Sequence, residues 1–202
     1  IWASVSRAVR SPARFDHNIR LDLAALPPGA LAPGSPTALV SLFGDKDFKS
    51  EELIAYELGY RVQPHPKLSL DFAGFLNFYD NLRTRFERRT PFLESSPAPP
   101  HLVLPNIISN KMNGETYGGE VVATWQAQKW WRLSATYSFL SMQLHTDPSS
   151  TDTVAEDAEG EIPRNQFMLR SLMDLPHNIE LDCTLRYVDR LPSIKVSSYV
   201  EG

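Results

Sequence analysis

The chain has 202 residues, of which 42% are hydrophobic and 22% charged, and this composition is too apolar for a disordered protein. No run approaches the roughly 18 uninterrupted apolar residues of a membrane-spanning helix, which excludes a helical transporter. The formal net charge of −4 argues against a nucleic-acid-binding protein, because such proteins usually carry a basic surface.

Alternation with a period of two residues is the main pattern of the chain. In residues 54–62 apolar side chains occupy the even positions, and polar or small side chains lie between them. This period is that of a β-strand whose two faces meet different surroundings. The strands expected from this pattern are 1–9, 54–62, 68–79, 116–126, 131–140, 166–175, 179–187 and one that begins near residue 196.

Short and long connections take turns along the chain. The tight links are 63–67, 127–130 and 175–178, and the long ones are about 10–49, 86–112 and 146–163. This asymmetry is typical of outer-membrane barrels, in which short periplasmic turns alternate with long extracellular loops. We therefore predict an all-β fold, an antiparallel up-and-down transmembrane β-barrel, of which the chain supplies about eight strands. A soluble antiparallel sheet with one solvated face is the alternative.

The two predicted faces differ in chemistry. Tyr60, Trp125, Trp131 and Tyr187 lie near strand ends on the apolar face, as in the aromatic girdles of membrane barrels. The other face is rich in charge and suits a hydrated lumen better than a packed core. The candidates for lumen-facing residues are Glu57, Arg61, Asp71, Asn77, Glu120, Arg132, Arg170 and Arg186.

Four strings of residues resemble TonB-dependent outer-membrane receptors. Residues 50–61, SEELIAYELGYR, are similar to a barrel strand of that family and form the most specific match. Residues 6–12, SRAVRSP, resemble a strand-to-loop element, and residues 113–120, NGETYGGE, resemble a strand opening. Residues 175–192 resemble a late barrel hairpin. The matches follow the order of the family and span nearly the whole chain.

The resemblance implies a barrel of about 22 strands closed by an N-terminal plug domain. Such receptors bind a ferric siderophore, haem or cobalamin outside the cell, and the TonB-ExbB-ExbD energy complex then moves the plug. Residues 1–202 are accordingly expected to be part of the barrel domain of an outer-membrane receptor, with the plug domain absent. The expected partners are the protein's own plug, the energy complex, a small-molecule ligand, and outer-membrane lipid and lipopolysaccharide, but no nucleic acid. The charged residues of the polar face are then lumen-facing or plug-facing.

Two charged segments fall in the predicted loops. Arg83, Arg85, Arg88 and Arg89 form a basic cluster that suits a phosphate or a carboxylate-rich chelate, lipopolysaccharide phosphates, or plain solvation. Residues 147–161 carry six acidic side chains and no Lys or Arg. They suit either a loop that attracts cations or a solvated, mobile loop.

No catalytic or metal-binding pattern is present in the sequence. The histidines are far apart, no Gly-x-Ser-x-Gly motif occurs, and the single cysteine, Cys183, excludes a disulfide framework. We therefore expect no enzyme activity, no metal and no cofactor. A small closed barrel of eight strands with a structural role is the alternative to a transport receptor. A barrel hydrolase would need a nucleophile with a base in reach, and none is apparent.

Overall fold

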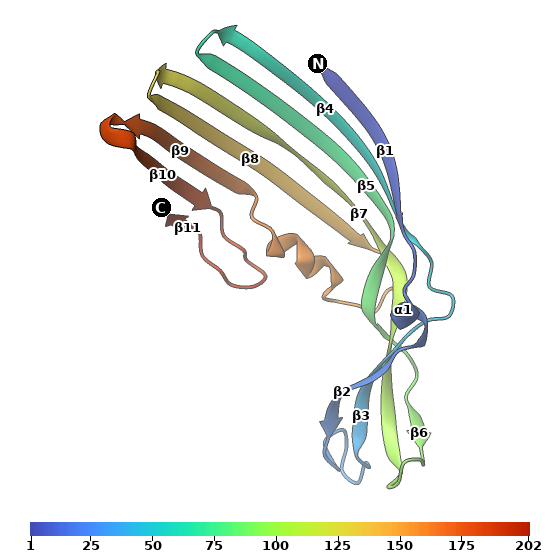
Figure 1. The fold of residues 1–202 in the computed structure, drawn as a ribbon. Helices are drawn as coiled ribbons and strands as arrows, with labels where there is room; N and C mark the ends of the chain where they lie inside the picture. Colours follow the sequence, from blue (N-terminus) through green and yellow to red (C-terminus); the bar gives the residue numbers. More distant parts are fainter.

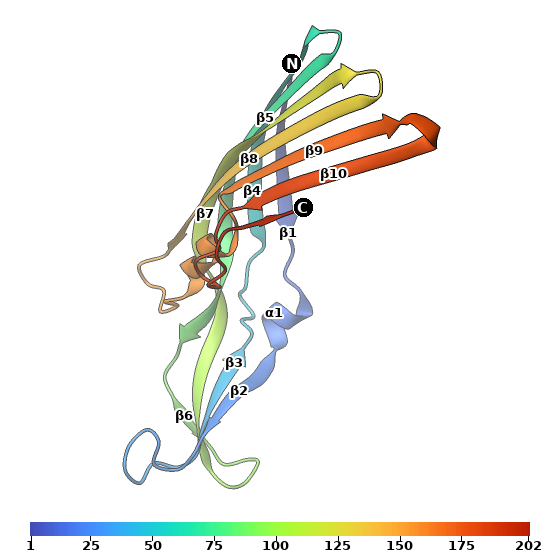
Figure 2. The same cartoon turned by 90° about the vertical axis from the view of Figure 1, so that its left-hand side faces the viewer.

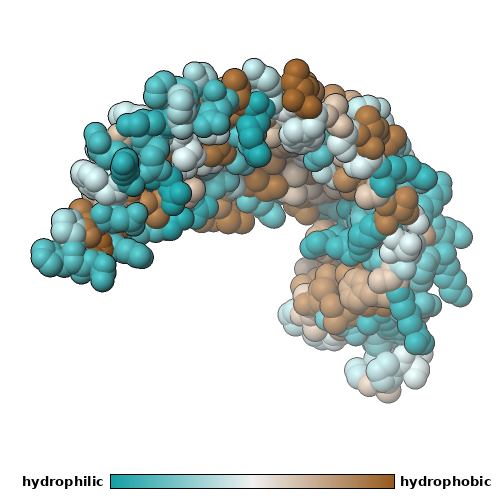
Figure 3. All heavy atoms as spheres, turned by 45° about the horizontal axis from the view of Figure 1, so that its top comes forward, coloured by the Kyte–Doolittle hydropathy of each residue, from teal (hydrophilic) through white to brown (hydrophobic).

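The computed structural model describes all 202 residues, and its main feature is a curved antiparallel sheet (Figure 1). Its strands, in spatial order, are β1 (Trp2–Arg10), β4 (Glu51–His65), β5 (Leu68–Arg88), β7 (His101–Gln128), β8 (Trp131–Thr146), β9 (Asn165–Leu175), β10 (Ile179–Val188) and β11 (Tyr199–Glu201). β1 and β11 are the outer strands of this order, and the space-filling view shows that the molecule is an open arch (Figure 3). The predicted all-β, antiparallel barrel wall of about eight strands is confirmed.

The strand register places the alternating residues on two separate faces. Leu58, Gly74, Gly119 and Phe139 lie opposite one another on four successive strands, so the apolar positions share one face. Large side chains on this apolar face are exposed to the surroundings: Val5, Ile54, Tyr56, Leu58, Tyr60, Phe72, Leu76, Phe78, Tyr117, Val121, Trp125, Tyr137, Phe167, Leu169, Leu181, Leu185 and Tyr187. An uncovered apolar surface of this extent is typical of a lipid-facing wall rather than of a soluble monomer.

The tight connections lie together at one end of the sheet and the long ones at the other (Figures 1 and 2). The tight ones are the turn at residues 66–67, the turn at residues 129–130 and the 3-10 helix η2 (Pro176–Asn178). We call the opposite end the loop end.

The loop end carries a small sheet of its own that extends beyond the wall (Figure 2). The first long connection contains the helix α1 (Arg14–Asn18) and the strands β2 (Arg20–Leu26) and β3 (Ala38–Phe43), and the second contains β6 (Phe92–Glu94). β2 pairs with β3, β3 runs parallel to the first part of β7, and β6 pairs with β7. We call this four-stranded sheet the extension.

The predicted loops therefore contain more regular structure than the sequence pattern suggests. Much of 10–49 and 86–112 is strand, and 146–163 contains the 3-10 helix η1 (Ala155–Glu161). A core cluster of Leu42, Phe48 and Ile108 lies at the base of the extension. The long connections are thus packed against one another and can position side chains.

Gly118 allows β7 to approach its neighbour closely. A Cβ atom on this residue would lie 2.2 Å from the backbone oxygen of Phe139 and 2.8 Å from Cζ of Phe75. We expect Gly118→Ala to destabilise the folded protein by about 1–3 kcal/mol, because the backbone of Phe139 cannot move away from the added methyl group without disturbing the strand pairing. Gly74→Ala is the matched control, since its nearest atom would be 3.7 Å away. The urea midpoint of heat-modifiable gel mobility measures both, and equal midpoints would contradict the prediction.

Candidate functional site

A buried carboxylate, Asp16, joins the first connection to the rim of the wall. Its side chain is 1% exposed and accepts a hydrogen bond of 2.8 Å from the backbone N–H of Ala13. Nη1 of Arg83 lies 3.2 Å from Oδ1, and Nη2 of Arg10 lies 3.4 Å from Oδ2. Arg10 also forms an ion pair with Glu51 on the next strand. Asp16 therefore fixes α1 against β1 and β5 by compensating charge on both.

A second buried carboxylate, Glu87, lies at the loop end of β5, outside the part of the strand that carries the apolar face. Its side chain is 2% exposed and accepts hydrogen bonds from Oγ of Ser150 and, at 2.9 Å, from the backbone N–H of Thr151. Nζ of Lys111 lies 3.4 Å from Oε2. Burial alone raises the pKa of Glu87, but the hydrogen bonds from Ser150, Thr151 and Thr84 and the charge of Lys111 outweigh it and lower this pKa. Glu87 is therefore ionised at neutral pH.

The third long connection occupies a free edge of β5. The register between β5 and β7 shifts between Thr84 and Glu87. Residues 85 and 86 therefore have no partner residue in β7. Oδ2 of Asp152 accepts the N–H groups of Arg85 at 2.8 Å and Phe86 at 3.1 Å. We call residues 149–154, which lie along this edge, the strap.

The acidic side chains that follow the strap also accept backbone hydrogen bonds. Oε1 of Glu156 accepts the backbone N–H and the hydroxyl of Thr146, both at 2.8 Å, and these bonds lower the pKa of Glu156. Oε1 of Glu159 accepts the N–H of Leu144 at 2.6 Å. Part of the acidic charge of 147–161 thus satisfies amides at the end of β8, a role that neither sequence-based alternative, a cation-attracting loop or a solvated one, included.

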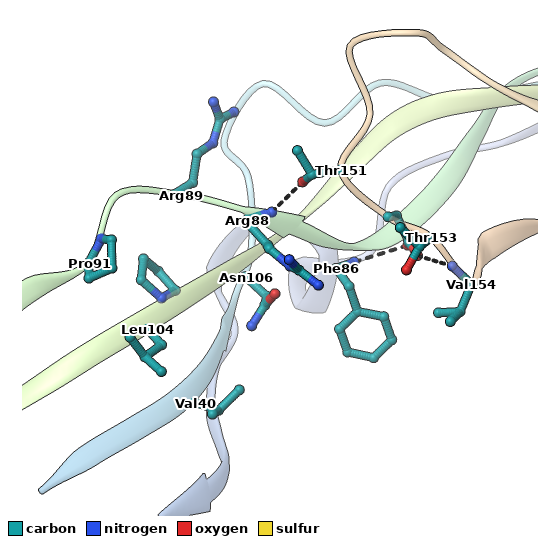
Figure 4. A pocket seen from close by; sticks show the side chains of 12 residues that line it. Val40, Phe86, Arg88, Arg89, Pro91, Leu104, Asn106, Thr151, Thr153 and Val154 are labelled. Atoms are coloured by element: carbon teal, nitrogen blue, oxygen red, sulfur yellow. Dashed lines mark hydrogen bonds between the residues drawn. The ribbon is translucent and has the colours of Figure 1, made fainter. Parts of the chain in front are cut away.

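Two adjoining cavities, of about 550 Å³ and 540 Å³, lie beside the strap. The first, which we call the distal cavity, lies against the extension and has a largely apolar wall (Figure 4). The second, the rim cavity, reaches the ends of β1 and β4 on the polar face at Arg10 and Glu51. Phe86, Asp152 and Val154 line both cavities.

The four arginines of the basic cluster are divided between these cavities. Arg83 lines the rim cavity but is held by Asp16. Arg85 lines the rim cavity, and Arg88 and Arg89 line the distal cavity. None of these three takes part in any of the ten ion pairs of the structure. In Figure 4 the Arg88 side chain reaches between Phe86 and Asn106, whereas Arg89 points away from them.

This arrangement can bind a ligand that is both anionic and apolar. An unpaired guanidinium offers several N–H donors in a planar fork, which suits carboxylate, phosphate or catecholate oxygens. Val40, Phe86 and Leu104 line the same distal cavity and offer apolar contact. Most ligand pockets combine a mainly apolar wall with a few polar groups in this way.

The eight polar-face candidates all lie on the face opposite the apolar one, and some of them pair across strands. Arg61 forms an ion pair with Asp71, Arg170 with Asp182, and Arg186 with Glu201. Nδ2 of Asn77 donates to Oγ1 of Thr116 at 3.0 Å. The remaining candidates, Glu57, Glu120 and Arg132, take part in no ion pair and leave their charge available on this face. Contact with a plug stays a prediction for all eight.

An ion pair joins the two outer strands of the extension. Nη1 of Arg20 in β2 donates to Oε1 of Glu94 in β6 at 2.9 Å, and Nη2 donates to Oε2. Nε2 of His101, which is 6% exposed, lies 3.2 Å from Oε2. Arg20 foremost, together with His101, lowers the pKa of Glu94 to about 2.

The extension is expected to loosen only in strong acid. Because the pKa of Glu94 falls from 4.5 to about 2 on folding, the stabilisation by this pair is complete above about pH 4.5 and is lost as the pH falls toward 2. We expect pepsin to cut residues 20–43 of the folded protein faster at pH 2 than at pH 4, relative to an unstructured reference peptide. Glu94→Gln removes the charge and should give fast cutting at both pH values. A wild-type rate that follows the reference peptide throughout would contradict this prediction.

Sequence reasoning did not find the carboxylates that organise the loop end. Asp16, Glu87 and Asp152 have partners 63–67 residues away in the chain, and no local pattern marks them. No group of three or more His, Cys, Asp or Glu side chains in the structure is placed to hold a metal ion. None of its helices has the length and apolar character needed to cross a membrane.

Comparison with known proteins gives one family match and several structural ones. Residues 1–188 match the family model described as TonB dependent receptor-like, beta-barrel. The chain is similar to the siderophore receptor PirA from Pseudomonas aeruginosa, with 14% identity and a TM-score of 0.56 over 98% of this chain and 31% of that one. It is similar to a mutant of the ferric enterobactin receptor PfeA from the same organism, with 16% identity and a TM-score of 0.65 over 98% and 29%.

A third solved structure has the same fold. The FrpB iron transporter from Neisseria meningitidis shares 15% identity and a TM-score of 0.59 over 93% of this chain and 24% of that one. The chain thus spans less than a third of the length of these proteins. No curated protein matches its sequence.

Proposed function

Because the chain belongs to the TonB-dependent receptor β-barrel family, we propose that it forms part of the wall of an outer-membrane receptor that imports a scarce ligand. The family match over residues 1–188 carries this proposal. The members of this family are outer-membrane proteins of Gram-negative bacteria, and the uncovered apolar face is suited to that location. The protein acts as a receptor and not as an enzyme.

The partners of this wall are a plug domain and the complex that moves it. Glu57, Glu120 and Arg132 carry unpaired charge on the polar face, where a plug would be enclosed by the barrel. The energy for import comes from the TonB-ExbB-ExbD complex acting through that plug. Outer-membrane lipid and lipopolysaccharide surround the apolar face.

A ferric siderophore is the ligand class that we propose. The unpaired guanidinium groups of Arg85, Arg88 and Arg89 suit a chelate with anionic oxygens, and the apolar wall of the distal cavity suits its organic body. PirA, which shares this fold, is named as a siderophore receptor, and PfeA as a ferric enterobactin receptor. Haem and cobalamin are the other classes to be tested.

A transport assay on a deletion strain tests this function. Cells with and without the full-length gene are offered ferric tricatecholate chelate, ferric citrate, haemin and cyanocobalamin, each labelled in its metal. We expect deletion to abolish the protonophore-sensitive uptake of the tricatecholate chelate, and the full-length gene to restore it. Loss of haemin or cyanocobalamin uptake alone would replace the siderophore with that ligand. Unchanged uptake of all four compounds would refute the receptor function.

The alternative of a small closed barrel is not favoured by the fold. In the structure β1 and β11 are separate outer strands of an open sheet rather than partners. Exposed strand edges cannot remain unpaired in lipid, because the backbone groups there have no water to bind. The wall needs further strands to close.

A further inference from the structure

The strap separates the distal cavity, which lies against the extension, from the rim cavity, which reaches the polar face of the wall. Thr151 and Thr153 face only the distal cavity, whereas Ala155 and Ala158, just beyond the strap, face only the rim cavity. Phe86, Asp152 and Val154 form a wall common to both. A solute that enters the distal cavity and moves toward the lumen therefore meets this wall.

The strap is held to β5 by side chains alone. No backbone–backbone hydrogen bond joins residues 149–154 to β5. The contacts are those of Glu87 with Ser150 and Thr151, those of Asp152 with the amides of 85 and 86, and a bond of 2.7 Å from the backbone N–H of Arg88 to Oγ1 of Thr151. Breaking them leaves the wall intact, because they are not part of its strand pairing.

The two ends of the strap are anchored independently of these contacts. Before it, the N–H of Asp147 donates to the backbone oxygen of Lys111 at 2.8 Å. After it, Oε1 of Glu156 accepts the backbone N–H of Thr146 at 2.8 Å. The strap is therefore a short segment between fixed ends, and it can leave β5 without unfolding the rest of the connection.

We propose that the strap is a gate between the distal and rim cavities, held closed by the hydrogen bonds that Glu87 and Asp152 accept. The gate rests on the proposed function, since it regulates passage of a ligand toward the lumen. In the closed position Phe86 and Val154 block the path with apolar side chains. When the strap leaves β5, the two cavities join into one path.

The test measures access to the rim cavity directly and uses no ligand. In the full-length receptor on intact cells, Cys183 is replaced by alanine and Met112, which lines the rim cavity, is replaced by cysteine. Two thiol reagents are applied to this reporter from outside the cell. One is N-ethylmaleimide, which is small, and the other is a polyethylene-glycol maleimide of about 5 kDa, which is a bulky flexible coil. We expect the small reagent to react readily and the large one slowly while the strap is closed.

Asp152→Ala should open the gate. It removes the carboxylate that accepts two backbone amides, which is expected to raise the labelling rate by the large reagent about tenfold or more. Asp157→Ala is the matched control, because Asp157 lines the rim cavity but its side chain forms no hydrogen bond to β5. A cysteine at Leu93, which is 63% exposed on the extension, should react equally in every background.

The outcomes separate the gate from the receptor function. Heat-modifiable gel mobility shows whether each variant is folded. If the alanine variant is not, Asp152→Asn replaces it, because its uncharged amide oxygen accepts the two backbone N–H groups more weakly than the carboxylate does, and a smaller increase in labelling is then expected. Equal labelling of the Met112→Cys reporter in the wild-type background and in the folded Asp152 variant would overturn the gate. Faster labelling in the folded Asp152 variant, together with unchanged uptake in the deletion strain, would support the gate and refute import.

Discussion

Replacing Asp16 with alanine is expected to destabilise the first long connection by about 3 kcal/mol, near the lower end of the cost of breaking a buried ion pair. The side chain is 1% exposed, and its loss leaves Arg83, which is 24% exposed, without a carboxylate partner. Arg10 keeps Glu51 and is 48% exposed, so that most of the loss arises at Arg83. The effect should be local, because the strands of the wall do not depend on this cluster.

Hydrogen exchange of the full-length receptor, followed by mass spectrometry, measures this effect. Peptides covering residues 14–26 should lose protection in Asp16→Ala, while peptides covering 68–79 should not change. Asp47→Ala is the control, because Asp47 is an exposed residue of the same connection. The double variant Asp16→Leu with Arg83→Met should cost less than the sum of the two single changes, since it leaves no unpaired charge. Additive costs would show that the two side chains do not interact.

Reversing the charge of Arg88 is expected to reduce the affinity for an anionic chelate by at least roughly 10-fold to 100-fold. One hydrogen bond to a charged group contributes about 1.5–3 kcal/mol, which corresponds to this range. Arg88 reaches into the distal cavity, so Arg88→Glu places a negative charge against the ligand (Figure 4). The affinity of Arg88→Lys should lie between those of the wild type and Arg88→Glu, because lysine keeps the positive charge but not the planar fork of N–H donors.

Binding of ferric tricatecholate chelate to the full-length receptor measures the change. Arg164→Glu is the matched control, since Arg164 is exposed and lines neither the distal nor the rim cavity. Arg89→Glu should have a smaller effect than Arg88→Glu, because Arg89 points away from Phe86 and Asn106. Equal affinity of the Arg88→Glu and Arg164→Glu variants would contradict a role for the distal cavity in binding.

The strands of the barrel wall could be predicted because each one is determined by a pattern of neighbouring residues in the sequence. Alternation in residues 54–62 and 68–79 fixes both the strand and the face of each side chain, and a single slip of register would reverse every face. The tight turns follow in the same way from short links between such runs. Arg61 and Asp71, which pair in the structure, were assigned to one face on this basis alone.

The extension could not be predicted in this way. Residues 38–43, ALVSLF, are apolar almost throughout, because β3 is buried or half-buried on both faces. Its partner in β7 contains Pro105, which argues against a strand in any local assessment. The parallel pairing of these two segments depends on packing between distant parts of the chain.

The buried carboxylates show the same limit for the site. An acidic run such as 147–161 predicts solvation, because charge is costly to bury without a partner. Asp152 is nevertheless 6% exposed, since the shifted register of β5 presents unpaired amides for it to accept. The arginines could be found from the sequence because they are clustered. The fold decides which of them form an ion pair with a carboxylate and which do not.

The parallel pairing of β3 with β7 also sets an order of assembly. Residues 38–43 align with residues 102–107, so β3 cannot take its place beside β7 until the intervening strands β4 and β5 have brought β7 into position. The hairpins of the wall, such as β4 with β5, close over much shorter stretches of chain and need no such wait. Because contacts between distant segments form more slowly than local ones, the hairpins form first and the pairing of β3 with β7 in the extension forms last. The hairpin of β2 and β3 therefore spends the early part of folding without β7, and the second edge of its apolar segment 38–43 is then open to mispairing.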